Sequence, residues 1–93
     1  MNILTINTSS NKEITIGLRV NNKEDTIKQE IGEQKAQVVL SLIDKLLKKH
    51  DLTTHDIDTV EVNTGPGSFT GLRVGISVAN TLGVTLQIPI NGQ

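Results

Sequence analysis

The chain has 93 residues, which is enough for one domain and too few for two. Nine Lys or Arg residues nearly balance ten Asp or Glu residues, and a net charge of −1 excludes strong electrostatic attraction to nucleic acid or to an anionic membrane. The sequence has no cysteine and only one aromatic residue, which excludes disulfides, thiolate metal sites and a base-stacking platform.

Three strands are predicted in the first third of the chain. Residues 2–8 and 13–20 alternate between apolar and polar side chains, as half-buried strands do. Asn21 and Asn22 between the second and third strands are typical of a two-residue hairpin, because asparagine tolerates positive φ. Residues 25–31 form a weaker third strand, whose polarity suits a sheet edge.

Residues 33–50 are predicted to form the first helix. Its apolar arc covers about 200°, whereas packing on one sheet needs a stripe of about 100°. Either the helix contacts both the sheet and a neighbouring helix, or part of this apolar arc is a surface for a partner. A loop over residues 51–58, with a helical turn after Thr53 or Thr54, leads to the next strand.

The second half continues with a strand at residues 59–64, a helix at 68–82 and a strand at 85–90 that should end early or lie at an edge because of Pro89. The order is βββαβαβ, and strands that follow crossover helices should run parallel to the first. Because four of the five strands have one apolar and one polar face, we expect an α/β fold with both helices on the apolar face of a mixed sheet.

The stretch from Asn63 to Gly83 is the most unusual part of the chain. Small residues recur there every four positions, at Gly67, Gly71, Gly75, Ala79 and Gly83, so they form a smooth ridge on one side of a helix. Each interior glycine costs about 1 kcal/mol relative to alanine. The ridge therefore predicts the close approach of another backbone.

The glycine turn, Gly65, Pro66, Gly67 and Ser68, does not match a phosphate-binding motif. The third glycine comes one residue late for a dinucleotide fingerprint, and the Lys-Ser/Thr of a Walker loop is missing. We interpret the segment as a tight turn in which Ser68 caps the second helix.

Other candidate chemistry is sparse. His50 and His55 lie in a polar loop, and no ligand set with metal-binding spacing is found. Arg73 is flanked by the ridge; it faces solvent, pairs with an acid or meets a partner, and the first two are favoured.

The stretch GPGSFTGLRVG resembles the signature of the TsaB (YeaZ) family of tRNA threonylcarbamoyladenosine biosynthesis proteins. The opening MNILTINTSS is similar to that family's ILAIDTS, and LIDKLL at residues 42–47 is similar to its LIDELL. The resemblance implies a ribonuclease H-like lobe of the actin/Hsp70/sugar-kinase superfamily, with five strands in the order 3-2-1-4-5.

Two departures from the family bear on activity. Its members have a second lobe, so residues 1–93 correspond to a single N-terminal lobe, and Asn7 stands where a phosphate-loop acid is expected. Thr5, Glu61 and Asn63 replace small apolar residues on the polar sheet face. We hypothesise a self-sufficient single-lobe protein that lacks the second lobe.

The resemblance implies a non-catalytic scaffold in tRNA N6-threonylcarbamoyladenosine modification, which pairs through its two helices with itself or with a TsaD-like enzyme. We expect a cytoplasmic protein without cofactor or metal, and without direct contact to nucleic acid or membrane. Alternatives are a homodimer of unrelated role and half of an ATP-binding unit completed by another chain. The expected interface residues are Val39, Ile43, Leu46, Gly71, Leu72, Gly75, Val78 and Ala79.

Overall fold

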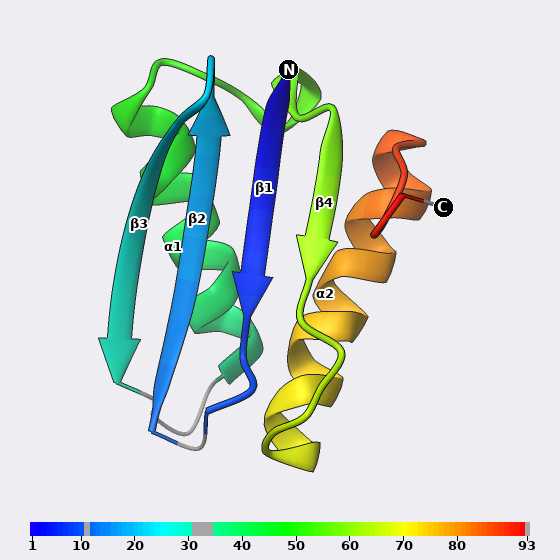
Figure 1. The fold of residues 1–93 in the computed structure, drawn as a ribbon. Helices are drawn as coiled ribbons and strands as arrows, with labels where there is room; N and C mark the ends of the chain where they lie inside the picture. The colour runs from blue at the N-terminus through cyan, green and yellow to red at the C-terminus, as the bar shows by residue number, and fades with distance from the viewer. Residues whose placement is uncertain (11, 31–34, 93) are drawn as a thin grey trace.

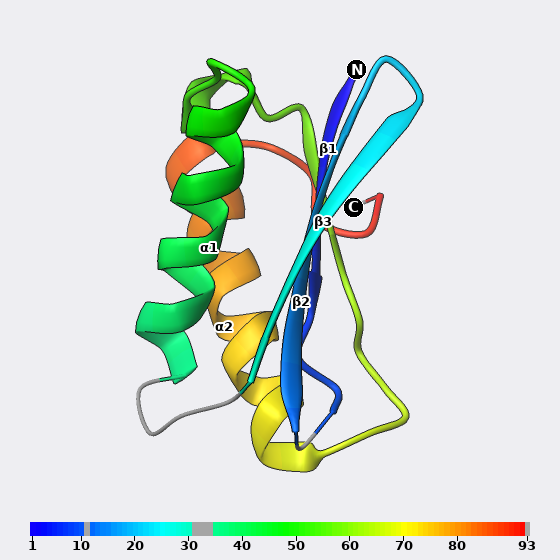
Figure 2. The same cartoon turned by 90° about the vertical axis from the view of Figure 1, so that its left-hand side faces the viewer.

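Two layers make up the computed structural model, which describes residues 1–10, 12–30 and 35–92. The α-helices cover one face of a sheet and leave its other face open (Figures 1 and 2). In chain order the elements are β1 (Asn2–Asn7), β2 (Glu13–Val20), β3 (Lys23–Glu30), α1 (Lys35–Lys49), the short 3₁₀ helix η1 (Thr54–Asp56), β4 (Thr59–Val62) and α2 (Phe69–Leu86).

The sheet has the strand order β3-β2-β1-β4, with β1 antiparallel to β2 and parallel to β4. Asn21 and Asn22 connect β2 to β3 with φ values of 53° and 67°, which confirms the predicted hairpin. The register pairs Ile16 with Ile27 and Ile6 with Ile16, so aliphatic side chains line up across three strands on the helix-facing side.

The prediction of a fifth strand at residues 85–90 is wrong for the part of the chain that the structure describes. Helix α2 continues to Leu86 and ends at Gln87, whose φ is 56°. The returning chain makes only an isolated parallel bridge, between Val60 and Ile90. Pro89 has no N–H to extend the pairing, and the Asn91 side chain takes over by bonding Val62 N at 2.8 Å and Val62 O at 3.0 Å.

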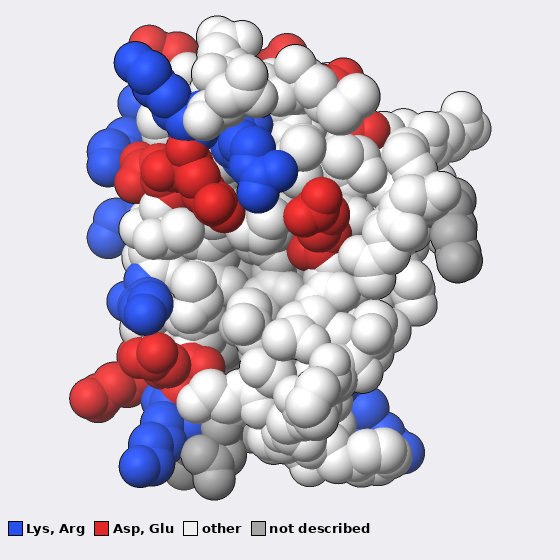
Figure 3. Space-filling model, viewed as in Figure 1, with Lys and Arg blue, Asp and Glu red and all other residues white. Residues whose placement is uncertain are grey.

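The core lies between the sheet and the helices, as the alternation predicts. Its largest fully buried side chains come from β1, β2, β4 and α1: Leu4, Ile6, Ile14, Ile16, Leu18, Val39, Leu46 and Val60. The opposite face is polar, and acidic and basic side chains alternate on it over β3 and β2 (Figure 3). Two of its ion pairs are Arg19–Glu24 at 3.8 Å and Lys28–Glu13 at 3.9 Å.

The end of α1 is fastened to the edge strand β3 through Asp25. Its Oδ2 atom lies 2.8 Å from Lys49 Nζ and 3.0 Å from His50 Nε2. The hydrogen bond from Lys49, and then that from His50, hold the pKa of Asp25 below its usual range. Asp25 therefore stabilises the fold in its ionised form.

Replacing Asp25 with asparagine should lower stability slightly at neutral pH and have less effect in acid. Because the folded-state pKa is depressed, the contribution is present above the unfolded-state pKa of about 4 and is lost as pH falls through the folded value. Urea unfolding of both proteins at about pH 5 and about pH 2 measures this difference. Asp44→Asn, which removes an exposed i,i+4 pair with Lys48, is the control; a gap for Asp25→Asn that widens in acid would contradict the expectation.

Candidate functional site

The glycine turn joins β4 to α2 and lies against the chain that follows β1. Gly65 and Gly67 have φ values of 135° and 157°, and the Gly65–Pro66 peptide is cis. Ser68 N donates a hydrogen bond of 2.6 Å to Ser9 O. A Cβ atom on Gly67 would lie 2.6 Å from that same oxygen, so glycine is required where the two segments meet.

Ser68 caps α2, as its position in the sequence predicts. Its Oγ atom accepts a hydrogen bond of 3.3 Å from Gly71 N, and its carbonyl accepts one of 2.9 Å from Leu72 N. The turn and the cap together fix where the helix begins relative to β1.

Thr8, directly after β1, is inserted into the hydrogen-bond ladder of α2. Its side chain is 1% exposed; the hydroxyl donates to Gly71 O at 2.5 Å and accepts from Gly75 N at 3.2 Å. In a regular helix those two backbone groups would bond to each other. A Cβ atom on Gly71 would overlap Thr8 O, and one on Gly75 would overlap Thr8 Oγ1. The ridge does meet another backbone, and that backbone is the chain's own.

Seven of the eight expected interface residues are buried within the lobe itself, and their place in an interface stays a prediction. Leu72 is half-buried, and the seven buried ones are Val39, Ile43, Leu46, Gly71, Gly75, Val78 and Ala79. They pack against the sheet or between the helices, because the smooth side of α2 is used for the approach to Thr8.

The outward side of α2 carries an exposed stripe that we call the outer stripe. It consists of Phe69, Arg73, Ser77, Asn80 and Val84, which fall within one side of the helix. Phe69 is 70% exposed and Val84 80%, while Leu40 on α1 is 50% exposed. Arg73 is the only charged residue in the 18 residues of α2. The helical wheel could have indicated this stripe, but a single charge in 18 residues does not distinguish the exposed side of α2 from the buried one by pattern.

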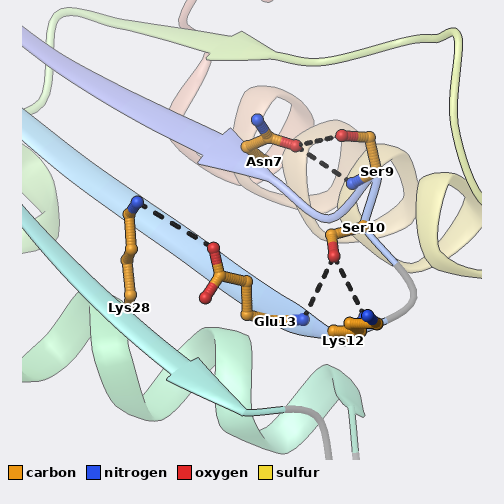
Figure 4. Close-up of polar contacts among 6 residues, drawn as sticks. All are labelled: Asn7, Ser9, Ser10, Lys12, Glu13 and Lys28. Carbon is orange, nitrogen blue, oxygen red and sulfur yellow. Dashed lines mark hydrogen bonds and ion pairs between the residues drawn. The ribbon is translucent and has the colours of Figure 1, made fainter.

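A cluster of amides and hydroxyls joins the ends of β1 and β4. Asn7 Oδ1 accepts hydrogen bonds from Ser9 N at 3.0 Å and Ser9 Oγ at 2.6 Å (Figure 4). Asn63 Nδ2 lies 3.4 Å from Asn7 Oδ1 and 3.3 Å from Ser9 Oγ, and Asn63 Oδ1 accepts from Gly65 N at 2.9 Å. These groups hold the glycine turn in place without any charge.

The open sheet face is hollowed beside this cluster. Thr5, Glu61 and Asn63, the polar replacements noted in the sequence, all line the hollow, whose volume is about 830 Å³. Within residues 1–10, 12–30 and 35–92, no group of three His, Cys, Asp or Glu residues could hold a metal ion. The helices described there are also too short or too polar to cross a membrane.

Comparisons with known proteins agree with this architecture. The family model "TsaD: tRNA N6-adenosine threonylcarbamoyltransferase" matches residues 19–92. The tRNA threonylcarbamoyladenosine biosynthesis protein TsaB of Bacillus subtilis is 34% identical over 98% of the chain, and that of Buchnera aphidicola subsp. Schizaphis graminum is 39% identical over 75%. YeaZ from Pseudomonas aeruginosa has a similar structure over 96% of the chain, with a TM-score of 0.87 and 27% identity. The chain spans 40%, 29% and 41% of the lengths of these three proteins.

Proposed function

We propose that this chain, which belongs to the TsaB/YeaZ family, serves tRNA N6-threonylcarbamoyladenosine modification as a non-catalytic partner of a TsaD-like enzyme. The match of the TsaD family model to residues 19–92 is consistent with this membership. Its relatives are named for threonylcarbamoyladenosine biosynthesis, and the matching family model is that of the transferase. In this proposal the transferase supplies the chemistry and the present chain supplies a binding surface.

The outer stripe of α2 is the observation that carries the proposal. Three of the four large apolar side chains exposed on the described surface, Leu40, Phe69 and Val84, lie on the two helices. A helix surface with a single charge resembles the core of a protein interface, where charged residues are depleted and aromatic and Arg residues are enriched. Phe69 and Val84 expose apolar surface at the two ends of this stripe, and a partner would remove that surface from water.

The neutral cluster at the ends of β1 and β4 supports a non-catalytic role. General acid–base catalysis needs a side chain that exchanges protons near the working pH, and the Asn7 and Asn63 amides do not. The Asn7 oxygen is already engaged by Ser9. This arrangement suits a segment that positions α2 rather than one that transfers groups.

Native mass spectrometry of the chain, alone and mixed with a TsaD-like protein from the same source, tests the proposal. We expect a one-to-one complex, and Val84→Glu should weaken it about tenfold because it replaces an exposed apolar side chain of the outer stripe with a charge. Thr26→Glu adds the same charge on the open sheet face and should leave binding unchanged. If the wild-type chain forms no complex at micromolar concentration, or if the two variants behave alike, pairing through the helices is wrong.

A further inference from the structure

We propose that two copies of this chain pair through the outer edge of β3, in one antiparallel register that the charges of the strand select. β3 is the first strand in the sheet order, and among the described residues it pairs only with β2. Figure 2 views the sheet from this side, with β3 nearest the viewer and no described helix or strand in front of it. The proposal is independent of the function proposed above, because α2 lies toward the opposite edge of the sheet (Figure 1).

The backbone of β3 directs the hydrogen-bonding groups of every second residue outward. The Asn21–Asn22 turn closes on the paired residues Val20 and Lys23, and a two-residue turn of this kind places a hydrogen bond between them. Bonded and non-bonded positions alternate along an antiparallel pair. The even-numbered residues from Glu24 to Glu30 therefore turn their N–H and C=O groups away from β2, and such a row is a template for a further strand.

A second copy fits this row in a small number of ways. Antiparallel pairing about a two-fold axis is the closed arrangement for two identical strand edges. Because the axis is normal to the sheet, it keeps the side chains on their faces, so even-numbered residues lie opposite even-numbered ones. Four positions of the axis place at least five residues of β3 opposite the second copy, and they are Asp25, Thr26, Ile27 and Lys28.

Like charges disfavour three of these four registers. An axis at Asp25 or at Lys28 places that residue directly opposite its own copy. An axis at Ile27 places Glu24 of each copy opposite Glu30 of the other. Like charges directly opposite one another destabilise a pair of strands, which is one way in which edge strands avoid aggregation.

The remaining axis, at Thr26, brings opposite charges together. Glu24 of each copy then lies opposite Lys28 of the other, on the open face of the sheet. These two side chains are 41% and 64% exposed, and their ion pairs within the chain, with Arg19 and Glu13, are long at 3.8 and 3.9 Å. Both can therefore reach across the edge, and the charges of β3 select this single register.

An exchange of charges between two variants tests the register. Glu24→Lys places a lysine opposite Lys28, and Lys28→Glu places a glutamate opposite Glu24, so each variant alone should dimerise about tenfold more weakly than wild type. When the two variants are mixed, both opposing pairs carry unlike charges. The mixture should therefore form a one-to-one dimer with about the wild-type affinity, which titration calorimetry of one variant into the other measures. We expect a wild-type Kd of about 100 μM, since a strand edge buries little apolar surface, so analytical ultracentrifugation of each protein extends to about 1 mM.

Two further variants control for effects within one chain. Glu61→Lys makes the same charge reversal on β4, at the other edge of the sheet, and should leave dimerisation unchanged. The double variant Glu24→Lys/Lys28→Glu restores unlike charges across the axis and should dimerise as wild type does. Circular dichroism establishes that every variant is folded.

Each outcome bears on the β3 edge alone. If the wild-type chain stays monomeric throughout this concentration range, the proposal is wrong while the proposed function stands. If it dimerises and neither single variant is weaker, the copies pair through another surface. If both single variants are weaker and their mixture does not recover, the charges act within each chain and the register is overturned.

Discussion

Replacing Gly71 with alanine should lower the free energy of unfolding by about 3 kcal/mol, although alanine is the better helix former by about 1 kcal/mol. The new methyl group would overlap the Thr8 carbonyl oxygen. That oxygen belongs to the backbone at the end of β1, so it cannot move aside as a flexible side chain could. The strand and α2 would have to separate, with loss of contacts in the core between them. Chemical denaturation followed by circular dichroism measures the change.

Gly83→Ala is the matched control on the same ridge. A Cβ atom there would lie 2.7 Å from Ile90 Cγ1 and 2.8 Å from Ile90 Cδ1, which are side-chain atoms, and its backbone neighbour, Ile88 O, would be 3.3 Å away, so a smaller shift suffices than at Gly71. The gain in helix propensity should offset this adjustment, and stability should stay within about 1 kcal/mol of wild type. Equal losses for the two variants would show that close approach to Thr8 is not what selects glycine at position 71.

Most of the fold follows from patterns that depend on near neighbours in the chain. The alternation of apolar and polar residues predicts β1, β2, β3 and β4. The Asn21–Asn22 turn sets the register between β2 and β3. The 3.6-residue period predicts α1 and α2. The last strand is wrong because residues 85 and 86 suit a helix as well as a strand, and the choice depends on distant contacts. Ile90 and Asn91 meet Val60 and Val62, about 30 positions away in the sequence.

The site is harder to predict than the fold, because its main contact joins residues far apart. In the sequence, Thr8 looks like an ordinary turn residue. The glycine ridge predicts that a backbone approaches α2 closely, but not which one. Thr8 is 63 positions from Gly71 and 67 positions from Gly75 in the sequence. Without that pairing, the two sides of α2 are hard to distinguish, because the helix has a single charge, and the buried side is easily assigned to a partner. The exposed one, with Phe69 and Val84, is identified only once the sheet occupies the other.

Thr8→Val should destabilise the fold by about 3 kcal/mol, even though valine has nearly the same shape as threonine. The hydroxyl satisfies two buried backbone groups, Gly71 O and Gly75 N, and valine can bond neither. Each buried group left without a partner costs about 1–3 kcal/mol. The added methyl group would also keep the two groups apart, so the helix could not close its own ladder. Thermal and urea unfolding measure the loss.

Two further substitutions at Thr8 separate this bridging role from simple packing. Thr8→Ser keeps the hydroxyl and removes one buried methyl group, which should cost only about 1 kcal/mol. Thr8→Ala removes both the hydroxyl and the methyl group that separate the two backbone groups, so Gly75 N can bond Gly71 O directly. We therefore expect Thr8→Ala to be less damaging than Thr8→Val, the reverse of the order that lost packing volume would produce. If Thr8→Ala is the worst of the three, Thr8 acts by filling space. The position of α2, and with it the outer stripe, would then not depend on a hydroxyl inserted in its backbone.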